Sequence, residues 1–150
     1  MENEHLIVIV SPAADAFGFA ESGGHIIDAA TIDAAEGGKA RGRAAPGLDS
    51  LGQVFVVLAD DFPRQAIYGD VAVAPSPPER AVVVARGHDS HDPAIAITTE
   101  YTLGAGARFV EIRTTVSATH ALAHYAVGDA IQWGHAEHFR PGAGVQQKGT

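Results

Sequence analysis

Three closely spaced histidine pairs are the groups in this sequence best able to bind a metal ion or move a proton near neutral pH. They hold six of the chain's eight histidines. Imidazole nitrogens are common zinc ligands, and a site with three protein ligands leaves a fourth position for water. The pairs are His88 with His91, His120 with His124, and His135 with His138.

The first pair is flanked by two carboxylates, Asp89 and Asp92, in a predicted connection before Ala94. Two imidazoles and two carboxylates could together supply three ligands to one Zn²⁺ ion. The alternative is a solvated polar loop in which Asp89 caps the following turn. The residues leave both interpretations open.

The second pair has the spacing that binds one metal on a helix, but Ala121 stands where the zincin motif has a glutamate. We predict a strand here instead. Four residues along a strand place His120 and His124 on one face about 13 Å apart, which is too far for a single ion. Each would need ligands from neighbouring strands.

The third pair follows Trp133 and Gly134. In an extended segment His135 shares a face with Glu137, whereas a turn would bring His135 toward His138. If the strand ends converge, the three pairs could contribute to one site. We therefore predict that some of the six histidines bind a divalent metal, either zinc or manganese.

A metal-bound hydroxide is the nucleophile that this sequence favours. It contains no Gly-x-Ser-x-Gly elbow, no P-loop and no Gly-x-Gly-x-x-Gly before a helix. A bound metal lowers the pKa of its water toward ~7 and polarises the scissile oxygen. The predicted activity is hydrolysis of activated phosphate or carboxylate esters. The candidate general bases are Asp89, Asp92 and Glu137, and the candidate oxyanion-stabilising residues are Arg86 and Arg140.

Short β-branched or alternating runs, separated by turn residues, must position these side chains. The clearest are 95–103 and 110–116, whose period of two predicts adjacent antiparallel strands. With no convincing amphipathic helix, the pattern predicts an all-β antiparallel sandwich of around nine strands, one domain over 1–150. A Gly- and Ala-rich loop is expected over 29–50. The other predicted strands are 5–10, 25–27, 53–58, 66–68, 71–73, 81–85, 120–127 and 130–133.

Composition restricts the partners. The chain has 150 residues, no cysteine and a formal charge of −8. Disulfides and cysteine-bound zinc are therefore excluded, and a nucleic-acid partner is disfavoured because such binding needs clustered Lys and Arg. No apolar run reaches the ~20 residues of a membrane span, and the N-terminus has no signal-peptide pattern. We expect a soluble protein, cytoplasmic, or secreted if it belongs to a longer exported chain.

Six segments carry recognisable motifs: 3–6, 18–28, 49–53, 62–68, 86–90 and 128–134. Together they resemble a β-sandwich module of large bacterial proteins, which is similar to the galactose-mutarotase supersandwich and is followed there by a PHP-type metallohydrolase domain. The resemblance spans most of the chain, but its motifs are structural. A full supersandwich is longer and the PHP domain is absent, so the chain is similar to a free-standing portion.

The resemblance implies a second function, a non-catalytic carbohydrate-binding or structural module of a larger metallohydrolase. A glycan would bind aromatic side chains on a sheet face, and a third alternative is metal-free, mutarotase-like acid/base chemistry by a His and a Glu. A sandwich cut from a larger one should also leave edge strands unpaired. A homodimer or higher oligomer is therefore expected. The candidate aromatic residues are Tyr101, Tyr125, Trp133 and Phe139.

Overall fold

The computed structural model describes residues 1–14, 18–32, 51–58 and 64–133. None of these residues is helical, so the all-β prediction is confirmed. Within them, no helix has the length and apolar character needed to cross a membrane. The described strands are β1 (Leu6–Val10), β2 (Ile26–Thr31), β3 (Leu51–Leu58), β4 (Ala66–Val73), β5 (Arg80–Asp89), β6 (Ile95–Gly104), β7 (Glu111–Ala118) and β8 (Val127–Trp133).

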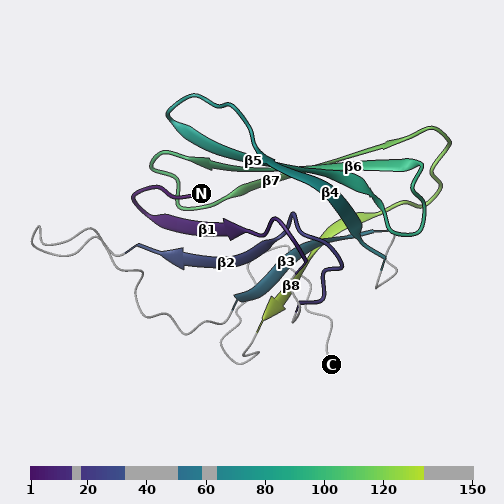
Figure 1. Ribbon diagram of the computed structural model, residues 1–150, viewed down its shortest axis with the longest axis horizontal. Helices are drawn as coiled ribbons and strands as arrows, with labels where there is room; N and C mark the ends of the chain where they lie inside the picture. The colour runs from purple at the N-terminus through teal and green to yellow at the C-terminus, as the bar shows by residue number, and fades with distance from the viewer. Residues whose placement is uncertain (15–17, 33–50, 59–63, 134–150) are drawn as a thin grey trace, which may run out of the picture.

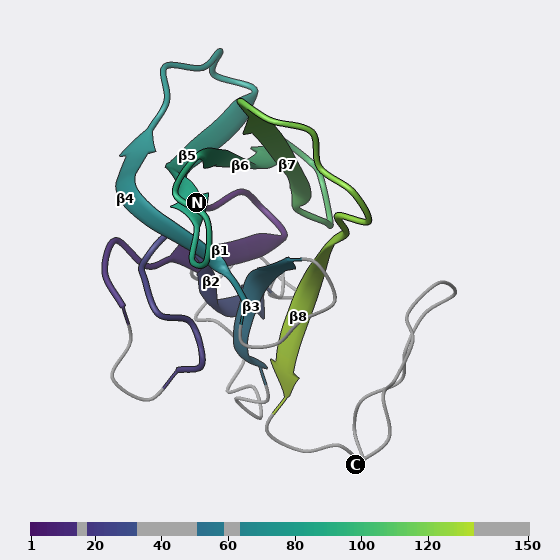
Figure 2. The same cartoon turned by 90° about the vertical axis from the view of Figure 1, so that its right-hand side faces the viewer.

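The strands form two four-stranded antiparallel sheets stacked as a sandwich (Figure 1). One sheet has the order β1-β2-β3-β8, and the other has the order β4-β5-β6-β7. Figure 2 shows β8 continuing the first sheet beyond β3, although β7 precedes it in the chain. Among the described strands, the chain therefore crosses between sheets twice, from β3 to β4 and from β7 to β8.

Alternating apolar side chains from both sheets fill the space between them. One buried cluster joins Val56 and Leu58 of β3 to residues of β4, β5 and β6. A second joins Val8 of β1 and Ile26 of β2 to Val83 and Tyr101 of the other sheet. This is the arrangement that period-two sequences produce when one face of each strand is buried.

The β6–β7 hairpin confirms the clearest local prediction. Its register runs without interruption from Ile95 opposite Ala118 to Thr102 opposite Glu111. In β6 the inward residues are buried and the outward ones are exposed or half-buried. The alternation in sequence therefore corresponds to the two faces of the sheet.

The two predicted segments 66–68 and 71–73 are one strand. β4 is continuous across Gly69, and the register with β5 shifts between Tyr68 and Asp70, as in a β-bulge. On β5, a Cβ at Gly87 would lie 1.8 Å from the carbonyl oxygen of Ile67. Only glycine allows the two backbones to approach this closely.

The predicted strand over 120–127 is wrong. Residues 119–126 form no strand and bend at 119–120 and 123–124. β8 begins at Val127 and includes the Gly128-Asp129 pair, which lies between the two predicted strands 120–127 and 130–133. The segment is rich in Ala, which has weak strand preference. His124 adopts a φ of 54°, which an extended strand does not contain. The 13 Å separation of His120 and His124 rested on that strand and no longer applies.

Two other boundaries also differ from prediction. His88 and Asp89 are the last residues of β5 rather than part of a connection, because β5 pairs with β4 as far as Asp89 opposite Ala66. β2 extends to Thr31, so the predicted loop over 29–50 starts later. Most of that loop, 33–50, lies outside the described residues.

Candidate functional site

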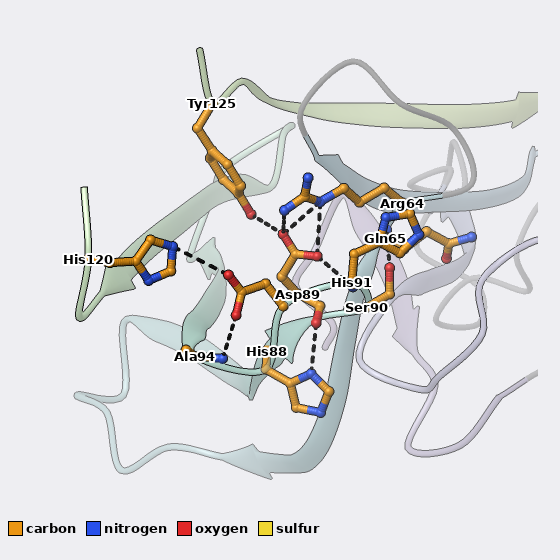
Figure 3. Close-up of polar contacts among 10 residues, drawn as sticks. Arg64, Gln65, His88, Asp89, Ser90, His91, Ala94, His120 and Tyr125 are labelled. Carbon is orange, nitrogen blue, oxygen red and sulfur yellow. Dashed lines mark hydrogen bonds and ion pairs between the residues drawn. The ribbon is translucent and has the colours of Figure 1, made fainter. Parts of the chain in front are cut away.

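Asp89 is the centre of the polar contacts in the histidine-rich region (Figure 3). Its side chain is fully buried, at 0% exposure, although it lies at the end of a strand. A buried carboxylate is unstable without hydrogen-bond donors and a counter-charge. Asp89 has both.

Four groups supply hydrogen bonds to this carboxylate. Arg64 Nε donates to Oδ1 at 3.0 Å and to Oδ2 at 2.9 Å, and Arg64 Nη2 donates to Oδ2 at 2.7 Å. The hydroxyl of Tyr125 donates to Oδ2 at 2.7 Å, and the backbone N–H of His91 donates to Oδ1 at 2.8 Å. We call Arg64, Asp89, Tyr125 and the His91 backbone N–H the Asp89 cluster.

The charges within this cluster favour the ionised carboxylate. Burial alone would raise the pKa of Asp89, but the bonds from Arg64, His91 and Tyr125 outweigh it and lower the pKa below its ordinary value. The hydrogen bond to Asp89 raises the pKa of Arg64. Burial, followed by the bond to Asp89, raises the pKa of Tyr125. The guanidinium carbon of Arg64 also lies 5.4 Å from the centre of the Tyr125 ring, a cation–π contact.

The Asp89 cluster joins the two places where the chain changes sheet. Arg64 lies between β3 and β4, and its carbonyl accepts a bond from the N–H of Leu58 at 3.0 Å. Tyr125 lies between β7 and β8. Asp89 bonds to both from the end of β5, so one carboxylate fixes both crossings.

A second set of contacts holds the same corner together. The N–H of Gln65 donates to Ser90 Oγ at 3.1 Å, and the N–H of Ser90 donates to the Gln65 carbonyl at 2.9 Å. Gln65 is buried, and its side chain bonds the backbone of Phe19 and Glu21. Described residues of the motif segments 62–68, 86–90 and 18–28 therefore meet here.

The described candidate histidines do not form one cluster. His88 Nδ1 is 2.9 Å from the carbonyl of Asp89, and His120 Nε2 is 3.3 Å from Asp92 Oδ2. Asp92 Oδ1 accepts a bond from the N–H of Ala94 at 3.0 Å, a turn-capping contact. Figure 3 shows the rings of His88, His91 and His120 apart from one another around Asp89.

Within the described ranges, no group of three or more His, Asp or Glu side chains is placed to hold a metal ion. The third predicted pair, His135 and His138, lies outside these ranges, as do Glu137 and Arg140. The zinc or manganese site therefore stays a prediction that the described residues do not complete.

Arg86 is not directed toward Asp89. Three residues apart on β5, the two side chains lie on opposite faces of the sheet. Arg86 Nη1 contacts Asp70 Oδ2 at 3.1 Å on the outer surface, where the two side chains are 55% and 60% exposed. Arg64, which sequence reasoning did not select, is the arginine at this carboxylate.

The aromatic side chains proposed for glycan binding are partly used inside the domain. Tyr101 is buried, and its hydroxyl donates to the carbonyl of Gly24 at 2.7 Å. Tyr125 bonds Asp89. Trp133 ends β8, but its side chain lies outside what the structure describes, as does Phe139.

Sequence reasoning missed the partners of Asp89 and the buried glutamines. Arg64 and Gln65 lie within the motif segment 62–68, and Gln53 ends the motif segment 49–53. An arginine or glutamine next to an apolar strand within such a motif could have indicated a buried polar contact, because these side chains are rarely buried unless they are paired. Tyr125 lies in the segment wrongly predicted as a strand.

Comparison with known proteins adds no assignment. No protein-family model matches the chain, and neither a curated protein nor a solved structure gives a significant match.

Proposed function

We propose that this chain is a non-catalytic β-sandwich module with a structural role in a larger assembly. This is the function implied by the resemblance to sandwich modules that precede PHP-type metallohydrolase domains. The observation that carries the proposal is the Asp89 cluster, in which the most buried carboxylate of the histidine-rich region joins both crossings between the sheets.

The chemistry of Asp89 favours structure over proton transfer. A general base needs a free lone pair within reach of the substrate or its water. Asp89 has no exposed surface and already accepts bonds from Arg64, Tyr125 and the backbone of His91. The same bonds lower its pKa and make it a weaker base.

A structural role is favoured over glycan binding by the two described tyrosines. A stacking platform needs an exposed ring face. Tyr101 is 2% exposed, and the guanidinium of Arg64 lies over the ring of Tyr125. Both hydroxyls are also used in hydrogen bonds within the domain.

The test compares metal content, turnover and stability in purified protein. We expect no stoichiometric zinc or manganese, no hydrolysis of p-nitrophenyl phosphate or acetate above buffer, and a melting temperature unchanged by EDTA. Asp89→Asn should lower the melting temperature strongly. Asp70→Asn, which alters the exposed ion pair on the same sheet, is the matched control and should not.

The opposite result is equally specific. One equivalent of zinc or manganese, with ester turnover abolished by EDTA and restored by the metal, would establish the hydrolase instead. In that case His88→Ala, His91→Ala and the double variant His135→Ala/His138→Ala would show which pairs hold the ion. An Asp89→Asn protein that melts like the parent would remove the structural argument.

A further inference from the structure

His25 is a fully buried histidine that the histidine pairs do not include. Its exposed fraction is 0%, and neither ring nitrogen has a hydrogen-bond partner within the described residues. The ring lies between the sheets, edge-on to Phe55 of β3 at 6.1 Å between centroids and tilted against Tyr68 of β4 at 5.1 Å. A neutral imidazole normally uses one nitrogen as a donor and the other as an acceptor, so this burial is costly.

The residues before His25 bridge the two sheets. We call Gly18–His25 the 18–25 segment. Its N–H groups at Phe19 and Ala20 both donate to Gln53 Oε1 of β3 at 3.0 Å. On the other sheet, the N–H of Tyr68 donates to Ser22 Oγ at 3.0 Å.

The end of the segment is held just as closely. The N–H of Gly24 donates to the carbonyl of Ser11 at 2.7 Å, and the Gly24 carbonyl accepts the hydroxyl of Tyr101. Gly24 has a φ of +82°, and a Cβ there would lie 2.6 Å from the Tyr68 ring. The segment therefore places the His25 ring between the sheets with little freedom to turn.

We propose that His25 is an acid-sensitive switch: when its ring gains a proton, the 18–25 segment leaves the space between β3 and β4 and the sheets lose this bridge. A charged imidazolium has two N–H donors and needs solvent or an acceptor. Its described ring contacts are two aromatic side chains. The ring can gain hydration if the segment opens, which costs less than separating whole strands.

Among the described residues, no charged group stabilises a protonated His25 ring. Phe55 of β3, which contacts the ring, is uncharged. Tyr68 and Tyr101 stay neutral in acid, because burial raises the pKa of Tyr68 to about 12 and raises that of Tyr101 further. On the segment itself, Glu21 is exposed to solvent.

Asp129 of β8 is a carboxylate that interacts with Tyr68, which contacts the His25 ring, and with Tyr101, which bonds Gly24. It is exposed, and it affects the titration of Tyr68 and Tyr101 rather than that of His25. Desolvation raises the pKa of Asp129. An Asp129→Asn variant separates its titration from that of His25.

The sign follows from proton linkage. Burial lowers the pKa of His25 from 6.5 to about 4 in the closed form, so the open form binds the proton more strongly. The closed form is fully favoured above pH 6.5, loses ground as pH falls to about 4, and changes no further below it. The ratio of open to closed form should rise about 20-fold from pH 7 to pH 5 and roughly 300-fold in total.

Hydrogen exchange in the full chain tests the proposal. We expect the opening constants of the Phe19, Ala20, Glu21 and Gly24 amides, corrected for intrinsic exchange, to rise about 20-fold from pH 7 to pH 5. The amides that pair β5 with β6 should exchange more slowly than those of the 18–25 segment at both pH values. His25→Phe should remove the pH dependence in the 18–25 segment, and exposed His91→Phe should keep it.

Two results would overturn the switch. The first is an opening constant that does not change with pH in the parent protein, or one that still changes with pH in His25→Phe. If His25→Phe does not fold, His25→Leu takes its place in this comparison. The second is exchange of the 18–25 amides only together with those of β5 and β6. That pattern would mean that His25 lowers the stability of the whole fold and that the 18–25 segment does not open by itself.

Discussion

Asp89 and His25 are both fully buried titratable side chains, but their surroundings are opposite. Asp89 accepts hydrogen bonds from two side chains and one backbone N–H, and it has a counter-charge in Arg64. His25 has aromatic rings beside it and no hydrogen-bond partner for its ring nitrogens in the described part of the chain. Equal burial therefore stabilises the fold at one site and weakens it at the other, because the partners determine the cost.

The two sites also respond to acid over different ranges. The pKa of Asp89 is lowered, so the stability it contributes is complete above its ordinary value of 3.8 and is lost as pH falls through the lower, folded value. His25 begins to favour the open form below pH 6.5. Mild acid should therefore loosen the 18–25 segment before it weakens the Asp89 cluster.

The largest predicted effect comes from removing the counter-charge of Asp89. Arg64→Met leaves a buried carboxylate with no cation, so we expect a loss of about 3–5 kcal/mol in the free energy of unfolding at pH 7. Urea denaturation followed by circular dichroism measures it. Arg86→Met, which breaks the exposed pair with Asp70, should change stability by about 0.5 kcal/mol or less. Equal losses of stability in Arg64→Met and Arg86→Met would mean that the buried ion pair contributes no more than the exposed one.

The next effect has the opposite sign. His25→Phe replaces two unpartnered ring nitrogens with carbon in an aromatic setting, and we expect a gain of about 1–3 kcal/mol at pH 7.5. The same denaturation measurement applies, with exposed His91→Phe as control. Phe retains an aromatic ring at this position, whereas Leu would lose packing. A loss of stability in His25→Phe would therefore mean that the imidazole itself stabilises the fold.

A smaller loss should follow deletion of one bond in the Asp89 cluster. Tyr125→Phe keeps the ring beside Arg64 but removes the hydroxyl that donates to Asp89. We expect a cost of about 1–2 kcal/mol, since the acceptor is charged but Tyr125 is only half-buried. Tyr125→Leu, which also removes the ring, should cost more. If the Phe variant matched the parent, the hydroxyl would not hold the second crossing.

The smallest effect is expected at the exposed contact between His120 and Asp92. His120 and Asp92 are 47% and 35% exposed, so His120→Ala should alter the free energy of unfolding by about 0.5 kcal/mol or less at pH 7. Thermal melting with and without added zinc checks this. A zinc-dependent rise in melting temperature that His120→Ala abolishes would instead identify His120 as a metal ligand.

Local pattern was sufficient where one residue type repeats at a fixed period. The alternation over 95–103 and 110–116 predicted the β6–β7 hairpin because each strand buries one face. The same reasoning failed over 120–127, where Ala is the commonest residue and the one β-branched residue is Val127, at which β8 begins. There the bond from Tyr125 to Asp89 holds a conformation that periodicity does not encode.

The candidate site was predicted only in part. Asp89 was selected from its neighbours His88 and His91, but as a general base in a loop. Its assignment to the end of β5 depends on the register with β4, where it lies opposite Ala66. That register buries the carboxylate and brings Arg64 to it, and neither could be read from spacing along the chain.

By itself, the sequence determined most of the strand-forming runs, the all-β class and the absence of cysteine chemistry, because these depend on residue type and short-range period. Only the tertiary structure decided which polar groups are buried and with whom. Arg64, Asp89 and Tyr125 come from three separate segments, and His25 is enclosed by side chains from both sheets. Burial and pairing are properties of contacts between distant residues, so composition and spacing cannot fix them.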